Sequence, residues 1–177
     1  MKLTNPEKLI LTMLADVHEE LGINEVNTQL LKEAIYTDNT WALTWEMPGI
    51  VGDNGDKTPD EVIFVCDILN MWSVLESSYA QYTDHQKEQL AIDAAPFGTR
   101  VHFDGFDGNN ESTYLSIVNF LVNEMNRFNE FAGRDFNSHA PSIGGYRKML
   151  AVFKELPMDR QPLPLPLLSR VLQARRA

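Results

Sequence analysis

The stretch from residue 58 to residue 82, TPDEVIFVCDILNMWSVLESSYAQY, decides the fold class. It opens with Thr58 and Pro59 followed by two carboxylates, a pattern typical of a helix start with a capping box and negative charge at the positive end of the helix dipole. Apolar residues then occupy nearly every helical face as far as Tyr82. A helix that is apolar all round is surrounded by other elements. The stretch therefore predicts a long central helix in an all-α core.

Further helices are predicted on both sides of it. Thr4 and Glu7 form another capping box, and a helix from about Asn5 to Leu21 follows before Gly22. Helical periodicity also predicts helices at 26–35, over about twenty residues at 114–132, and at 146–156, with a weak helical patch at 86–95 in a polar connection. Residues 47–57 are rich in turn formers and are interpreted as a loop, which includes the acidic DNGD at 53–56. Sustained two-residue alternation is absent, so we expect no sheet.

Length and charge divide the chain unevenly. With 177 residues and 44% hydrophobic content, it fits one compact helical domain, residues 1–156, followed by a proline-rich linker and a basic amphipathic tail, residues 157–177. Residues 1–133 carry 7 basic and 22 acidic side chains, whereas residues 134–177 carry 8 and 3. The acidic charge of residues 1–133 repels phosphate backbones, so we do not expect nucleic acid to be a partner.

Cysteine content and hydropathy predict the compartment. A single cysteine excludes an internal disulfide and suits a reducing cytoplasm. The apolar stretch near the N-terminus is short and broken by polar residues, so we interpret it as part of a helix and not as a signal peptide. The chain contains no run of about twenty apolar residues, so no membrane span is predicted. We expect a soluble cytoplasmic protein.

The loop HFDGFDGNNESTY, residues 102–114, is the first candidate for chemistry. Asp104, Asp107 and Glu111 could supply oxygen ligands to a hard cation, but their spacing does not match a calcium loop. Asx residues and glycines before an apolar run are also typical of a turn that caps a helix. We favour this structural interpretation. The four histidines lack metal-ligand spacing, and no metal or cofactor is predicted.

The second candidate is RDFNSHAPSIGGYRKML, residues 134–150. Its mixture of basic, amide and aromatic groups could bind an anion or a carboxylate, or could be hydrogen-bonded scaffolding between two helices, and we favour the scaffold. Cys66 lies in an apolar helix and is interpreted as an inert core thiol. The candidate ligand-binding residues are Arg134, Asn137, His139, Tyr146 and Arg147, with Lys148 beside them.

Several long segments together resemble the YfbU family of uncharacterised bacterial proteins. They are LTNPEKLIL, WALTWEMPGI, VCDILNMWSVLESSY, FDGFDGNNESTY and FNSHAPSIGGYRKML. Residues 83–100 and 157–177 lie outside these segments, and the tail looks like an addition particular to this protein. The resemblance implies an all-helical, multihelical fold. It implies no enzyme activity or cofactor, and no site residue is carried over.

These observations favour a protein-binding or regulatory module that self-associates through a helical face. The tail either docks into a groove of a partner or packs on its own domain. The alternative is a hydrolase acting on a phosphorylated or nucleotide substrate. In it, Arg134, His139, Tyr146 and Arg147 bind the anion and Asp107 or Glu111 acts as base, which requires both clusters to share one concave pocket. Whether a small-molecule ligand binds is left open by the sequence.

Overall fold

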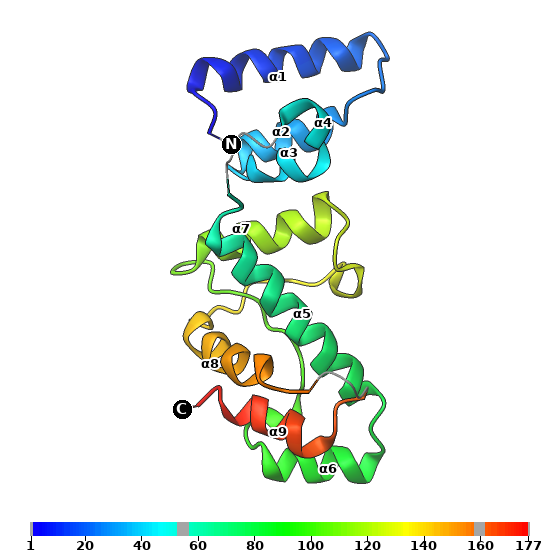
Figure 1. Cartoon of the computed structure of the whole chain (residues 1–177), viewed down its shortest axis with the longest axis vertical. Coiled ribbons are helices and arrows are strands. Elements are labelled where there is room, and N and C mark those ends of the chain that lie inside the picture. Colours follow the sequence, from blue (N-terminus) through cyan, green and yellow to red (C-terminus); the bar gives the residue numbers. More distant parts are fainter. Residues whose placement is uncertain (1, 53–56, 158–161, 177) are drawn as a thin grey trace. The chain divides into compact units, whose positions relative to one another are not determined.

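The computed structural model describes residues 2–52, 57–157 and 162–176 of the chain. Across these residues the regular elements are helices, apart from one isolated parallel β-bridge between Phe106 and Asn137 (Figure 1). The all-α prediction is confirmed. The α-helices are α1 Asn5–Glu20, α2 Thr28–Tyr36, α3 Trp41–Glu46, α4 Pro48–Val51, α5 Asp60–Ala80, α6 Asp84–Asp93, α7 Ser112–Asn119, α8 Ile143–Lys154 and α9 Leu165–Gln173. Three short elements are the 3-10 turns η1 Phe97–Thr99 and η3 Asn129–Phe131 and the π-helical turn η2 Phe120–Glu124.

The chain forms two compact units, and each is described by itself. Unit 1 comprises Met1–Val62 and Ser116–Gly133, and unit 2 comprises Ile63–Leu115 and Arg134–Ala177. The boundary falls inside α5 and α7, so it differs from the division at residue 156 that the sequence suggests. Residues 157 and 162–176 group with unit 2, and they are therefore part of a larger packed body.

Helix α5 is the long helix that the opening stretch predicts, with 21 residues. The part of α5 that belongs to unit 2 forms the centre of that unit's core. Its buried side chains are Val65, Ile68, Leu69, Met71, Trp72 and Leu75. The aromatic residues around it, Trp72, Phe103, Phe106 and Tyr146, pack against one another with ring centroids 5.7 to 6.2 Å apart. Aromatic pairs at such distances stabilise a core beyond the burial of the rings themselves.

Unit 1 begins with the capping box that the sequence predicts. The Thr4 hydroxyl accepts from the Glu7 N–H at 3.5 Å, and the Glu7 carboxylate accepts from the Thr4 N–H at 2.7 Å. Helix α1 then runs to Glu20 and packs against α2. In α3, Trp41 packs edge-on against Trp45, with ring centroids 5.1 Å apart, and against Phe120 at 6.0 Å.

Two predictions about local structure are wrong. The helix of about twenty residues at 114–132 ends at Asn119, continues as one π-helical turn, and then turns sharply, with left-handed φ values of 52° at Asn126 and 54° at Phe128. Contacts with α3 compete with helix continuation here, because Arg127 lies over the Trp45 ring at 5.0 Å and pairs with Glu46 at 3.2 Å. The predicted loop at 47–57 contains α4, while DNGD lies outside the described residues.

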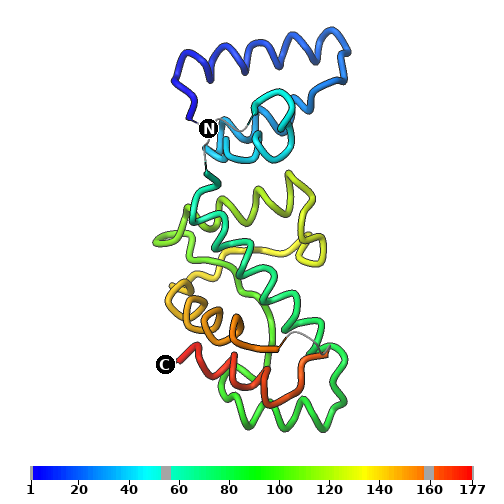
Figure 2. Tube along the Cα trace, in the orientation of Figure 1, coloured from blue at the N-terminus to red at the C-terminus, as the bar shows by residue number. Residues whose placement is uncertain are grey.

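The C-terminal tail packs on its own unit. Figure 2 shows α9 beside α6, and α9 also contacts α8. Leu168, Val171 and Leu172 of α9 are at most 1% exposed. Of the two alternatives left open above, packing on its own domain is therefore the one observed for the described residues of the tail.

Candidate functional site

Helix α1 presents an apolar face to solvent. Six large side chains are between 53% and 69% exposed, and we call them the α1 apolar face: Leu9, Ile10, Met13, Leu14, Val17 and Leu21. The other side of the helix packs on α2, with Ala15 buried. Figures 1 and 2 show no other element of unit 1 on the outer side of α1.

Polar side chains hold α1 in place along its flanks. Lys32 of α2 bridges Glu19 at 2.7 Å and Asp16 at 3.2 Å, and Lys8 pairs with Asp38 at 3.0 Å. The hydrogen bond from Lys32, followed by one from Thr28, lowers the pKa of Glu19. These ion pairs tie the acidic flank of α1 to α2.

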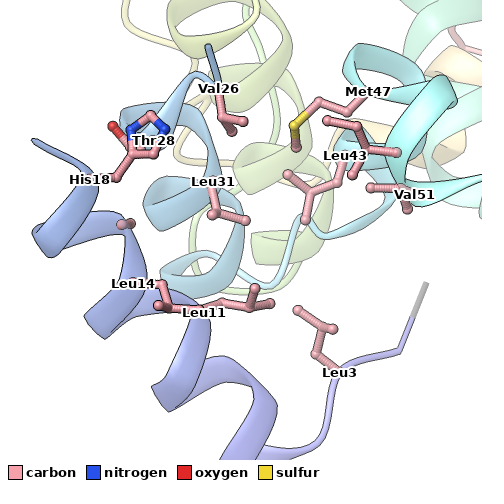
Figure 3. A pocket seen from close by; sticks show the side chains of 12 residues that line it. Leu3, Leu11, Leu14, His18, Val26, Thr28, Leu31, Leu43, Met47 and Val51 are labelled. Atoms are coloured by element: carbon pink, nitrogen blue, oxygen red, sulfur yellow. The ribbon is translucent and has the colours of Figure 1, made fainter. Parts of the chain in front are cut away.

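A groove of about 470 Å³ adjoins the same face. Its walls come from Leu3, Val26 and helices α1 to α4 and are almost wholly apolar, and His18 and Thr28 also line it (Figure 3). Leu14 belongs to both the groove and the α1 apolar face, so the two surfaces are continuous. The side chains on the walls include Leu3, Leu11, Leu14, Leu31, Leu43 and Met47.

In unit 2, Glu111 joins the two polar segments that the sequence singled out. Its buried carboxylate accepts from the N–H groups of Asp107 (3.0 Å), Ser142 (2.8 Å) and Ile143 (2.9 Å), and from the Ser142 hydroxyl (2.8 Å). Burial acts to raise the pKa of Glu111, but these hydrogen bonds outweigh it and lower the pKa. The carboxylate therefore accepts from backbone N–H groups at the start of α8 that have no partner within the helix, as a capping side chain does.

Asp107 and Asn137 play similar local roles. Asp107 accepts from the Asn109 N–H at 3.0 Å, and its pKa is lowered chiefly by the hydrogen bond from the Asn110 amide. The side-chain Oδ1 of Asn137 accepts from the N–H groups of Gly108 (3.1 Å) and His139 (3.0 Å). Their oxygen atoms are thus engaged with backbone donors, in the pattern expected of a structural loop.

The basic candidates are engaged too. Arg134 pairs with Glu76 through both carboxylate oxygens, at 2.9 and 2.8 Å, and Glu76 also accepts from the Phe103 N–H at 2.7 Å. Arg147 lies over the Phe64 ring at 4.8 Å. Arg134 is thus held by a bidentate ion pair within the protein, whereas Arg147 stacks on an aromatic ring with its side chain exposed.

Tyr146 is buried beneath the C-terminal segment. Arg175 lies 5.5 Å above its ring and 5.0 Å above that of Phe97, and its guanidinium reaches Asp104 at 3.4 Å. Burial raises the pKa of Tyr146. A fully buried ring under an arginine cannot reach a substrate from solvent.

A polar cavity of about 450 Å³ lies at the surface of unit 2. Of the predicted site residues, only Asp104 and Asn137 line it, beside Arg100, His102, Asp135 and Arg175. Arg134, His139, Tyr146, Arg147, Asp107 and Glu111 are not among its lining residues. Both polar segments therefore contribute residues to this cavity, but the residues assigned to anion binding and to the base do not line it, so the hydrolase alternative is not favoured.

The described residues hold no group of three or more His, Cys, Asp or Glu side chains arranged to bind a metal ion. Among the helices in the described part of the chain, none combines the length and the apolar content that crossing a membrane requires.

The sequence predicts helix α1 from the spacing of its apolar residues, but it does not show that these residues are exposed. Residues 10, 13, 14, 17 and 21 predict one apolar side of a helix, which ordinarily faces the core. The additional signal is that Leu11 and Ala15 supply a second apolar side. A helix with two apolar sides needs two partners, and unit 1 supplies one.

The described residues thus form a small multihelical protein with an exposed apolar face on α1. The YfbU domain matches residues 1–174, and the chain belongs to the YfbU family. UPF0304 protein MJECS11 of Methanocaldococcus jannaschii is 33% identical over 111 residues, which are 59% of this chain and 62% of that protein. The match therefore spans less than two thirds of the length of that protein. Neither description names an activity. The match also spans residues 83–100 and most of the tail, so the expectation that these segments lie outside the family is wrong.

Proposed function

We propose that the chain is a protein-binding module whose partner docks on the α1 apolar face. The observation that carries the proposal is the exposure of six large apolar side chains on one side of one helix. Contiguous apolar surface of this kind on a protein is typical of an interaction site. A cytoplasmic setting is part of the same proposal, since the single cysteine suits a reducing compartment.

The chemistry of the face favours a helical partner. Ile10, Leu14, Val17 and Leu21 follow a four-three-four spacing, the spacing with which one helix packs along another. We call these four residues the α1 seam. Covering a half-exposed aliphatic side chain is worth about 1–2 kcal/mol, so docking along the whole seam can drive association. Charged side chains are absent from the seam, and it therefore carries no desolvation cost of the kind that opposes burial of ions.

A site-specific photo-cross-linker tests this proposal. One form of the chain carries a benzophenone amino acid at Met13, on the α1 apolar face, and a matched form carries it at Ile92, an isolated apolar side chain of α6 that is 74% exposed. Both are irradiated in nuclease-treated lysate, and the products are identified by mass spectrometry. We expect a discrete protein adduct from position 13 alone. Equal products from both positions, or none from position 13, would contradict the proposal.

A further inference from the structure

We propose that the partner on this face is helix α1 of a second copy of the chain, packed antiparallel across a two-fold axis. The inference rests on the proposed function, because it names the partner for the same face. Three features of α1 carry it: the pairing of its seam residues, the placement of its charges, and the extent of its apolar surface.

The seam is self-complementary in an antiparallel pair. Its residues occupy alternating core positions of a heptad, and antiparallel helices place one kind of core position opposite the other. Ile10 then lies opposite Leu21 of the second copy, and Leu14 lies opposite Val17. By the two-fold symmetry the same contacts recur in reverse, so all four seam positions of both helices are filled. A single isologous contact covers the seam without a third element.

Charge selects the antiparallel direction. The last turns of α1 carry Asp16, Glu19 and Glu20, while its first turn has backbone N–H groups at the positive end of the helix dipole. Lys32 of α2 holds Asp16 and Glu19 on the side of α1 away from the seam, so these two carboxylates do not face the second copy in either direction. A parallel pair would set Glu20 beside Glu20 of the second copy, whereas the antiparallel pairing of Ile10 with Leu21 sets it near position 11. Like charges are thereby kept apart in a chain whose net charge is −10.

The apolar surface is large enough for a specific dimer. The α1 apolar face is continuous with the groove, whose rim includes Ile50 at 74% exposure, and Ile23 just beyond the helix is 40% exposed. A large apolar side chain contributes on the order of 100 Å² when covered. The face, the groove rim and the polar flanks together offer an area on the order of the 800 Å² that each partner of a standard interface buries.

The mass of the purified full chain in solution gives the first test. Light scattering after size exclusion, over a hundredfold range of concentration, should report twice the chain mass of 20.1 kDa at the upper end. Val17→Glu should shift the chain to 20.1 kDa throughout, because it places a carboxylate in the seam. Ile92→Glu, which adds the same charge to α6, should leave the dimer intact. A dimer that survives Val17→Glu overturns the proposal.

Cysteine cross-linking tests the direction of the pair. In a Cys66→Ser background, Ile10→Cys and Leu21→Cys are oxidised separately and as an equal mixture. An antiparallel pair yields a disulfide dimer only in the mixture, whereas a parallel pair yields one from each variant alone. Cross-links within either single variant, or none from the mixture while the dimer mass persists, overturn the proposed arrangement. Circular dichroism of every variant confirms that it is folded.

The outcomes separate this inference from the proposed function. A chain that stays at 20.1 kDa at every concentration overturns the inference. If the cross-linker at Met13 then captures a different protein, the proposed function stands with another partner. If it captures nothing, both fall. If the monomer is instead destabilised by Val17→Glu, the face is covered by the chain itself, which also overturns the inference.

Discussion

Helices α1 and α9 are both amphipathic, and they differ in what covers their apolar sides. The apolar residues of α9, Leu168, Val171 and Leu172, are at most 1% exposed within unit 2, whereas those of the α1 apolar face are more than half exposed. Amphipathicity therefore shows that a helix requires a partner surface and does not show where that surface is. For α9 the surface is in the same unit, and for α1 we propose a second chain.

Ion pairs do not account for this difference, because both helices have them. Arg170 of α9 pairs with Glu155 at 3.1 Å, as Lys32 does with Glu19 of α1 at 2.7 Å. Exposed pairs of this kind contribute little to stability. What distinguishes the two helices is apolar burial, and the following predictions test that distinction.

The largest expected effect contrasts a crowded glycine of unit 2 with an open glycine at the end of α1. Gly105 has a φ of 87°, and a Cβ there would lie 1.9 Å from the Phe136 carbonyl oxygen, which accepts from the Phe106 N–H at 2.8 Å. Gly105→Ala should cost more than about 4 kcal/mol in the free energy of unfolding. Gly22→Ala should cost only about 1–2 kcal/mol, because its φ of 66° is strained but nothing lies within 4 Å. Urea denaturation measures both, and equal losses would show that Gly105 is not crowded.

The next contrast removes one large side chain from each helix. Leu168→Ala should lower the free energy of unfolding by about 2–5 kcal/mol, since it leaves a cavity in unit 2. Ile10→Ala, measured at a concentration where the chain is monomeric, should change it by less than about 0.5 kcal/mol. Guanidinium denaturation followed by circular dichroism measures both variants. A large loss from Ile10→Ala would mean that the α1 apolar face is covered within the monomer.

The smallest effect depends on pH and tests how unit 2 is capped. The pKa of Glu111 is lowered from 4.5 in the folded chain, so the unfolded chain binds more protons in acid. Its contribution to stability is therefore complete above the unfolded pKa and is lost as pH falls through the lower, folded pKa. Glu111→Gln should cost about 2 kcal/mol at pH 7 and should flatten the decline in stability below about pH 4.5.

A matched variant controls for the loss of charge. Glu88 is an exposed acid of α6, and Glu88→Gln should leave the free energy of unfolding at pH 7 within about 0.5 kcal/mol of wild type. Denaturation curves recorded from pH 7 to about pH 2 provide the comparison. If Glu111→Gln keeps the wild-type decline in acid, the hydrogen bonds at the start of α8 do not set the pKa of Glu111.

Helix starts and the central helix could be predicted because their signals are local. Thr4 with Glu7 and Pro59 with its following carboxylates mark α1 and α5 within a few residues of sequence. The polar connection at 86–95 was underestimated, since Thr83 and Gln86 form a further capping box and start α6 at Asp84. This signal was present in the sequence and was missed.

The break after α7 could not be predicted from periodicity. Apolar residues at 118, 121, 125 and 128 fit a continuous helix, yet Phe128 adopts a left-handed φ of 54°. The contacts of Arg127 with Trp45 and Glu46 are made across more than eighty positions of sequence, so no local window contains them. The same holds for Glu111, whose partners Ser142 and Ile143 lie 31 and 32 residues away.

The sequence by itself determined the all-α fold, the long buried helix, the helix caps and the amphipathic character of α1 and α9, because these follow from residue spacing and from hydrogen bonds within one turn. Only the tertiary structure decided which apolar side is covered. Burial depends on the surface that another element presents, and elements meet through contacts between residues far apart in the chain. The tertiary structure therefore placed α9 in a core and left α1 with an apolar face open to a partner.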